Sequence, residues 1–154
     1  MTATTTAATT AENAARWGAA LRLAGLRVTA PRIAALESVA VHHHVDADTV
    51  AADVRAKLGT VSKQTVYDVF SALSEAGLVR KISVSDRRAL YELNQHDNHH
   101  HLVCRICERI EDIDCAAGEA PCIHLGDGES HGFAVDQAEV TFRGICPDCA
   151  AQHH

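Results

Sequence analysis

The stretch SKQTVYDVFSALSEAGLVRKISVSDRRALYEL, residues 62–93, predicts a helix followed directly by a β-hairpin. Ser62 is a good N-cap residue, and Gly77 is a good helix stop. Between them, apolar residues recur at helical spacing: Val66, Val69, Phe70 and Leu73. Two β-rich runs then flank a polar turn at residues 85–87, which is the pattern of a hairpin.

Three further helices are expected upstream. The first ends at Gly25, the second has Thr29 as N-cap and Pro31 in its first turn, and the third runs from the N-cap Asp46 to Gly59. Their inward-facing residues are expected to be Trp17, Ala20, Leu21 and Ala24, then Ile33, Leu36 and Ala40, then Val50, Val54 and Leu58. Helices followed by a hairpin predict a winged helix-turn-helix, although the spacing also fits a small α+β core without a ligand. The basic residues of the hairpin favour DNA binding: Arg80, Lys81, Arg87 and Arg88.

Charge is divided unevenly along the 154 residues, whose formal net charge is −6. Residues 1–95 carry 11 Lys and Arg against 9 Asp and Glu, a net of +2, whereas residues 96–154 carry 3 against 11, a net of −8. The second segment also holds all 6 Cys and 8 of the 11 His. We therefore expect a mildly basic module followed by an acidic module rich in metal ligands.

The expected fold class is α+β. Its parts are a disordered lead at residues 1–11, a winged-helix DNA-binding domain at 12–94, a hinge at 95–98 and a small α/β zinc-stabilised domain at 99–154. Strands of the last domain are expected at residues 101–106, 109–114, 132–136 and 138–146, with a loop at 116–131. The chain has neither an apolar run long enough to cross a membrane nor the features of a secretory signal, so we expect a cytoplasmic location and no membrane partner.

Two Cys-x-x-Cys pairs predict a structural zinc site, with the ligands Cys104, Cys107, Cys146 and Cys149. Four thiolates in a tetrahedron suit Zn²⁺, and cytoplasmic thiols stay reduced. A site closed by four sulfurs has no open position for catalysis, but it contributes on the order of 10 kcal/mol to the folding of a small module. Two redox pairs, or free buried thiols, remain alternative interpretations.

A run of three histidines predicts a second metal site. On a strand, His99 and His101 share one face and His100 points to the other. His99 and His101 are expected to bind an ion together, and the further ligand candidates are His44, Glu92 and Asp112. Nitrogen and oxygen ligands of this kind suit Fe²⁺, Mn²⁺ or Zn²⁺.

Other potential ligands stay open. His42 and His43 are interpreted as solvated surface residues. For the remaining candidates, the sequence is equally consistent with a further metal or redox site and with no site. These residues are His100, Cys115, Cys122, His124 and His131.

Taken together, these motifs resemble those of the ferric uptake regulator (Fur) superfamily of bacterial metal-dependent repressors. The resemblance covers roughly residues 16–150. It rests on the two Cys-x-x-Cys pairs and on the stretches LRLAGLRVTAPR, HHVDADTV, VSKQTVYDVFSALSEAGLV and YELNQHDNHHHLVC. It implies a homodimer in which each subunit joins a winged-helix domain to an α/β dimerisation domain, here residues 99–154.

The resemblance also implies roles for individual residues. The regulatory metal site, for Fe²⁺ or Mn²⁺ and with Zn²⁺ able to occupy it on purification, becomes His44, Glu92, His99, His101 and Asp112. The helix that begins near residue 63 becomes the recognition helix on a double-stranded DNA operator, and Arg27 approaches the minor groove. The expected DNA contacts are Arg27, Lys63, Gln64, Thr65, Tyr67, Arg80, Arg87 and Arg88.

The stretches DCAAGEAPC and RGICPDC resemble the branch of the superfamily that is linked to catalase-peroxidase genes. The predicted function is therefore a redox- or peroxide-responsive repressor of oxidative-stress genes that binds A·T-rich palindromic operators as a dimer. Three positions depart from the pattern. Glu92 stands where the best-described peroxide sensors have Asp, which supports an iron-responsive repressor of iron-uptake genes as the alternative. Asp68 stands where many relatives have Arg, and residues 115–131 are Gly-rich where a helix is expected.

Two functions from other classes are compatible with some of these motifs. A small metal hydrolase or oxygenase would use His99, His101 and Glu92 as a facial triad, but it needs a substrate pocket and a general base. The chain has only 6 aromatic residues (1 Trp, 2 Tyr and 3 Phe) and no surplus base, so no enzyme is predicted. The other interpretation is a zinc-stabilised protein-interaction module.

Overall fold

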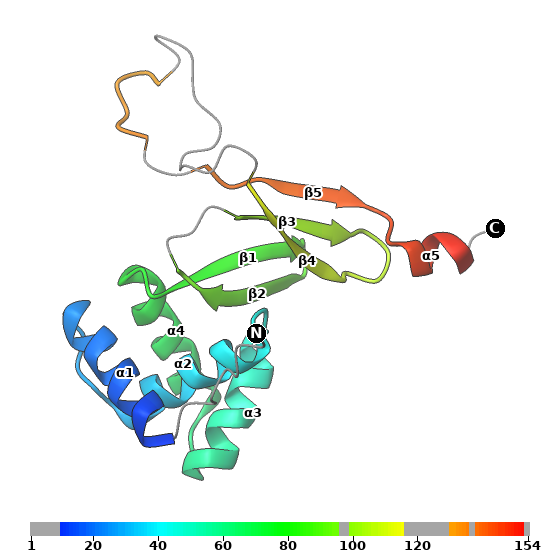
Figure 1. Ribbon diagram of the computed structural model, residues 1–154. Coiled ribbons are helices and arrows are strands. Elements are labelled where there is room, and N and C mark those ends of the chain that lie inside the picture. The colour runs from blue at the N-terminus through cyan, green and yellow to red at the C-terminus, as the bar shows by residue number, and fades with distance from the viewer. Residues whose placement is uncertain (1–9, 96–98, 116–129, 136–137, 153–154) are drawn as a thin grey trace, which may run out of the picture. The chain divides into compact units, whose positions relative to one another are not determined.

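A computed structural model describes residues 10–95, 99–115, 130–135 and 138–152 of the chain (Figure 1). The chain divides into two compact units. The first consists of Met1–Ser83 and Arg88–Asn94, and the second of Val84–Arg87 and Gln95–His154. The architecture is α+β, as the sequence predicts, with four helices preceding the hairpin and a small sheet following it.

Four amphipathic helices build the first unit: α1 (Thr10–Leu23), α2 (Ala30–His42), α3 (Ala47–Leu58) and α4 (Lys63–Glu75). Helix α1 begins at Thr10, so its first two residues fall within the lead expected at residues 1–11. The core is aliphatic with two aromatic residues, and its most enclosed side chains are those of Phe70, Leu21, Leu36, Leu73, Val39, Val50, Val54 and Val66. Each of these side chains lies on the inward stripe of its helix, where burial of apolar surface stabilises the fold.

The helix starts confirm two of the three predicted caps. The Asp46 carboxylate accepts a hydrogen bond from the Thr49 backbone N–H at 2.7 Å, and the Ser62 hydroxyl accepts one from the Thr65 N–H at 3.1 Å. Thr29 occupies the N-cap position of α2, but its side chain makes no capping hydrogen bond. The expectation for Leu58 was also wrong. This last residue of α3 is 37% exposed because the helix ends there and Gly59 turns the chain at φ +82°.

The predicted hairpin consists of β1 (Val79–Ser85) and β2 (Arg88–Leu93), with the turn between them. Tyr91 of β2 stacks on Phe70 of α4 at a ring-centroid distance of 4.1 Å. Its backbone also forms an isolated antiparallel bridge with Val45, through N–H to carbonyl bonds of 2.7 and 3.1 Å. This bridge fixes the segment between α2 and α3 against β2, which brings the neighbours of Val45 and Tyr91 close together.

In its described part, the second unit contains a three-stranded sheet and a short helix. The strands are β3 (His99–Cys104), β4 (Ile110–Asp114) and β5 (Thr141–Gly144), and the helix is α5 (Pro147–Gln152). The strand order is β4-β3-β5, with β3 antiparallel to β4 and parallel to β5. The register pairs His101 with Asp112 on one side and with Thr141 on the other.

Several boundaries in this unit differ from the sequence predictions. Residues 132–135 form no strand, and the strand expected at 138–146 is limited to Thr141–Gly144. Helix α5 was missed because Pro147 was interpreted as part of a turn, although proline is also well suited to the first turn of a helix. Most of the loop expected at 116–131 lies outside the described residues. Within the part of the chain that the structure describes, no helix is long and apolar enough to cross a membrane.

A polar network joins the C-terminal part of α2 to α3. The Ser38 hydroxyl donates to Asp53 Oδ2 at 2.6 Å, and His42 Nε2 lies 2.9 Å from the same oxygen. The hydrogen bond from Ser38, followed by that from His42, holds the pKa of the Asp53 carboxyl below its usual range. Because Ser38 is 6% exposed, its hydroxyl depends on Asp53 for a partner inside the protein.

We expect Asp53→Ala to destabilise the first unit by about 1 to 2 kcal/mol, because a buried hydroxyl loses its acceptor. Urea unfolding followed by the helical circular dichroism signal measures this change. The double variant Ser38→Ala/Asp53→Ala should recover part of the loss, since it removes the stranded donor as well. A double variant whose loss equals the sum of the two single losses would show that the hydrogen bond does not couple the two helices.

Candidate functional site

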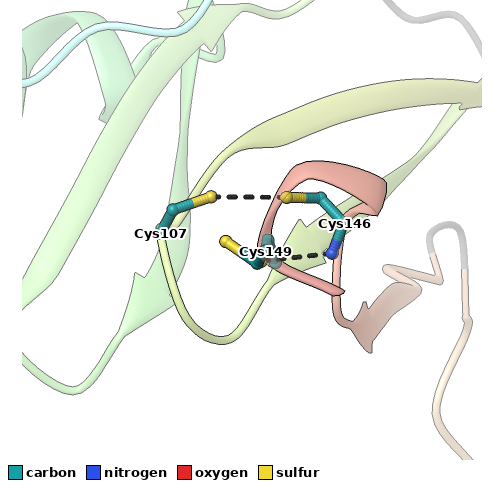
Figure 2. A group of neighbouring side chains, drawn as sticks. Cys107, Cys146 and Cys149 are labelled. Carbon is teal, nitrogen blue, oxygen red and sulfur yellow. Dashed lines mark hydrogen bonds between the residues drawn. The ribbon is translucent and has the colours of Figure 1, made fainter. Parts of the chain in front are cut away.

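Four cysteines of the second unit converge at the ends of β3 and β5. Cys104 is the last residue of β3 and Cys107 follows in the turn, while Cys146 precedes α5 and Cys149 lies within it. All four sulfur atoms lie within 4.8 Å of one another. Figure 2 shows Cys107, Cys146 and Cys149 gathered in this way, with the Cys107 and Cys146 sulfurs 3.7 Å apart.

The spacing of the sulfurs fits a tetrahedral Zn²⁺ ion. With Zn–S bonds of about 2.3 Å, the edges of such a tetrahedron are about 3.8 Å long. Backbone hydrogen bonds hold the cysteines in place. The Glu108 N–H donates to the Cys104 carbonyl at 2.9 Å and closes the turn that contains Cys107, with Glu108 at φ 60°. The Arg105 N–H donates to the Gly144 carbonyl at 2.9 Å and ties the first Cys-x-x-Cys pair to the strand that leads into the second. The structure thus brings together the four predicted ligands.

Electrostatics distinguish the four thiols. Hydrogen bonds from backbone N–H groups, first that of Cys107 and then that of Cys146, lower the pKa of the Cys104 thiol to about 6. Hydrogen bonding to Cys146, followed by burial, raises the pKa of the Cys149 thiol to about 12. Cys104 therefore loses its proton more readily than Cys149, which holds its proton the more tightly of the two. A metal that binds all four sulfurs must displace that proton, which makes the affinity for metal depend on pH.

A histidine and a carboxylate of the first unit form a second potential ligand group. The bridge between Val45 and Tyr91 sets their neighbours side by side, and His44 Nε2 lies 3.2 Å from Glu92 Oε2. Glu92 is buried at 4% exposure, and the Arg80 guanidinium donates to its other oxygen. Arg80 was expected to contact DNA. In the structure its guanidinium, which is 17% exposed, contacts Glu92 and compensates the buried negative charge, and the DNA contact stays a prediction.

A further ligand group lies in the second unit on the sheet. His99 and His101 share one face of β3, as alternation predicts, and their rings are 5.0 Å apart. The register with β4 places Asp112 beside them, with its Oδ1 3.5 Å from His101 Nε2 and 3.8 Å from His99 Nε2. Both imidazoles are largely buried, whereas the Asp112 side chain is 49% exposed. Two imidazoles and one reachable carboxylate are a suitable donor set for Fe²⁺, Mn²⁺ or Zn²⁺.

His100 points to the opposite face, also as predicted, and its ring centroid is 6.3 Å from that of Phe142. Of the other residues that were left open, Cys115 follows β4 directly and His131 is exposed. Cys122 and His124 lie outside the described residues. The interpretation of His42 as a solvated surface residue is incomplete, since His42 is bonded to Asp53.

Most of the expected DNA contacts lie on exposed surface. Lys63, Gln64 and Tyr67 project from α4, Thr65 is half-buried, and Arg27, Arg87 and Arg88 are exposed. Two acidic partners on this surface were missed by sequence reasoning. Asp48 pairs with Lys63 at 2.6 Å, and Asp68 accepts a hydrogen bond from Gln64 at 2.8 Å. Spacing of four residues on one helix signals the second pair, whereas the first joins two helices and has no such signal.

A surface pocket beside α4 also escaped the sequence interpretation. It is lined by Arg27, Thr29, Pro31, Arg32, Thr65, Asp68 and Val69. The Arg32 guanidinium donates to the Arg27 backbone carbonyl at 2.8 Å, and both arginines line this pocket near the start of α2. Such a pair is suited to a phosphate group, which adds Arg32 to the candidate DNA contacts.

Comparison with known proteins gives concordant results. The chain matches the ferric uptake regulator family over residues 23–149. It is 55% identical to the transcriptional regulator FurA of Mycobacterium tuberculosis over 130 residues, which cover 84% of this chain and 87% of that protein. Its fold is similar to that of the Pseudomonas aeruginosa ferric uptake regulator with manganese, with a TM-score of 0.65, 22% identity, and coverage of 85% of this chain and 98% of that one. It is also similar to a zinc uptake regulator complexed with zinc and DNA, with a TM-score of 0.63, 20% identity, and coverage of 96% and 99%.

The four-sulfur cluster yields a test with an internal control. We expect Cys146→Ser to abolish the tightly held zinc, about one ion per chain, and to unfold the sheet of the second unit. Cys115→Ser changes a thiol outside the cluster and should retain both. Metal content by mass spectrometry and release of zinc to a colorimetric chelator measure the outcome. Equal loss of zinc in both variants, or full zinc in Cys146→Ser, would contradict this assignment of ligands.

Proposed function

This chain belongs to the ferric uptake regulator family, and we propose that it is a metal-dependent, peroxide-responsive repressor that binds operator DNA as a homodimer. Membership makes it a metal-responsive transcriptional regulator and replaces the enzyme interpretation, because the proteins of this family regulate transcription. The repressor activity, the peroxide response and the dimeric operator complex are the parts that we add from the sites of this chain.

The observation that carries the proposal is the presence of two incomplete ligand groups made of nitrogen and oxygen donors, one in each unit. His44 and Glu92 lie 3.2 Å apart in the first, and His99, His101 and Asp112 gather in the second. Each group alone offers two or three donor atoms, which is fewer ligands than Fe²⁺, Mn²⁺ or Zn²⁺ normally binds. We propose that all five residues bind one regulatory Fe²⁺ or Mn²⁺ ion. The four cysteines would retain a structural Zn²⁺.

Such an ion couples metal concentration to the arrangement of the two units. It can shift their equilibrium only by the difference in its affinity for the joined and the separated ligand groups. A hundredfold preference for the joined state corresponds to about 2.7 kcal/mol per site. Arg80 competes with the ion for Glu92, because its guanidinium already neutralises that carboxylate within the first unit. The ion therefore exchanges with a resident cation and does not meet an uncompensated carboxylate.

The DNA-binding surface follows from the partition of charge. Helix α4 would enter the major groove, and two such helices in a dimer would contact half-sites about 34 Å apart, one turn of DNA. Arg27 would approach an A·T-rich minor groove, and Arg87 and Arg88 would contact phosphates. The excess negative charge lies in residues 96–154, so the net charge of −6 is compatible with DNA binding by residues 1–95 in the cytoplasm.

Peroxide would reverse the switch by oxidising a ligand. Fe²⁺ held by His99 and His101 would supply the redox chemistry by which one oxygen of hydrogen peroxide passes to a ring carbon of either histidine and the other leaves as water. The imidazole is oxidised by two electrons and the peroxide is reduced by two. A ring modified in this way binds metal weakly, so the ion leaves and the repressor releases the operator. Oxidative-stress genes, including catalase-peroxidase genes, are the regulated class that this chemistry suits.

The metal switch predicts that His44→Ala and His101→Ala each abolish metal-dependent operator binding while the zinc content and the helical content stay at wild-type values. The control is His43→Asn, which removes the neighbouring imidazole and should bind DNA normally. His43 is exposed and has a φ of 63°, a conformation that Asn tolerates. Fluorescence anisotropy with and without Mn²⁺ measures this binding, and metal analysis provides the second readout. Normal metal-dependent binding by either alanine variant would show that the two ligand groups do not share an ion.

The peroxide response predicts one added oxygen on the peptide that contains His99 and His101 after iron-loaded protein is treated with peroxide. Tandem mass spectrometry locates the added oxygen, and the manganese-loaded protein serves as the control that should remain unmodified. An iron-loaded protein that stays unmodified yet responds to iron would favour the alternative, an iron-responsive repressor of iron-uptake genes. The observation that supports this alternative is Glu92 at a position where peroxide sensors typically have Asp.

A further inference from the structure

Gln64 and Asp68 form a side-chain pair on the exposed face of α4. Gln64 Nε2 donates to Asp68 Oδ1 at 2.8 Å, and the two residues are one helical turn apart, where side chains are neighbours. Both residues are exposed. The pair therefore lies on the surface that the proposed function presents to the major groove.

Chemistry fixes the orientation of the Gln64 amide. An ionised carboxylate only accepts hydrogen bonds, so the NH₂ group of Gln64 must face Asp68 and the carbonyl oxygen must face away. One N–H is used in the contact. One N–H and the carbonyl remain, which together form a donor and acceptor pair side by side.

The other polar residues at the start of α4 are engaged differently. The Lys63 ammonium pairs with Asp48 at 2.6 Å and lies 5.9 Å from the centre of the Tyr67 ring. The hydroxyls of Ser62 and Thr65 bond to each other at 2.8 Å. Gln64 is the only amide among residues 63–75, so it alone on this helix carries a side-chain donor and acceptor on one rigid plane.

We propose that Gln64 reads one adenine in each operator half-site and that Asp68 is the positioning residue that presents its amide. This inference rests on the proposed DNA-binding function. Adenine shows an acceptor, N7, and a donor, the N6 amino group, in the major groove, and these match the remaining N–H and carbonyl of Gln64. Guanine shows two acceptors, which need two donors and would also approach the Asp68 carboxylate, so guanine is rejected at the same position.

The arrangement exchanges affinity for selectivity. A carboxylate on the DNA-facing helix repels phosphates and lowers the affinity for every sequence. In return, it removes the rotational freedom of Gln64 before DNA is bound, so less ordering is needed when the base is contacted. Asp68 thus has a role on this surface even though it offers no donor to guanine or to phosphate.

The test uses the full-length protein loaded with Zn²⁺ and Mn²⁺, and an operator selected from a random double-stranded DNA library. Each A·T pair of one half-site is then replaced by G·C in turn, and affinities are measured by fluorescence anisotropy. We expect wild-type protein to discriminate at one such position by about tenfold. Gln64→Ala and Asp68→Ala should both lose this discrimination at that position and keep it at the others. The double variant should be no worse than either single variant.

Two controls separate positioning from charge. Asp68→Asn removes the charge and keeps one acceptor oxygen, but its NH₂ group can also donate to the Gln64 carbonyl, so it should bind all sequences more tightly and retain only part of the discrimination. Glu75→Ala removes another acidic group from the exposed side of α4, at the end of the helix and without contact to Gln64, and should leave discrimination unchanged. Circular dichroism confirms that the helical content of each variant is intact.

The outcomes are distinct. Discrimination that persists in Asp68→Ala, or that is lost at no position in Gln64→Ala, overturns the inference. A loss in Asp68→Ala that Glu75→Ala reproduces also overturns it, because charge and not the hydrogen bond would then set the preference. Failure of the wild-type protein to bind any selected DNA would instead contradict the proposed function.

Discussion

The sulfur cluster is the constraint on which the second unit depends. In strands β3 to β5 and helix α5, the buried apolar side chains are those of Val103, Cys104 and Cys149. Two of these three are members of the cluster itself, so there is little core to hold the sheet once the sulfurs are separated. An ion bound by all four sulfurs would join the ends of β3 and β5 to α5 and replace the missing core. The first unit, with its continuous aliphatic core, has no such requirement.

Because sulfur ligands would maintain this fold, the nitrogen and oxygen ligands are available for a reversible role. Removal of an ion from His99, His101 and Asp112 leaves the strands of the sheet paired, because the four cysteines that would hold the sheet are not ligands of that ion. Removal from His44 and Glu92 leaves a carboxylate that Arg80 still neutralises. Neither unit therefore needs an ion at these ligands in order to fold. This separation is what a metal sensor needs if it is to lose its regulatory ion without unfolding.

The sequence was sufficient where the signal is local. Helical spacing, the caps Asp46 and Ser62, the hairpin turn and the two Cys-x-x-Cys pairs each lie within a few residues, and the structure places them as expected. The contacts that the sequence did not predict, and the one cap that it predicted wrongly, involve tertiary context. The contact of Arg80 with Glu92 crosses the hairpin, the pair of Lys63 with Asp48 joins two helices, and Thr29 has the sequence of a cap without the hydrogen bond. Pro147 could begin a helix or form a turn, and only the packing of Cys149 into the cluster distinguishes the two.

Backbone pairing explains why the nitrogen and oxygen ligands are harder to assign from sequence than the sulfurs. Alternation along β3 is enough to place His99 and His101 on one face, but it does not identify their carboxylate. Asp112 becomes their neighbour only through the register of β3 with β4, and a slip of one residue would turn it to the other face. Likewise, His44 meets Glu92 only because Val45 is bridged to Tyr91. The proposed regulatory site thus depends on two pairings that no short motif contains, whereas the proposed zinc site depends on two Cys-x-x-Cys pairs that the sequence contains entirely.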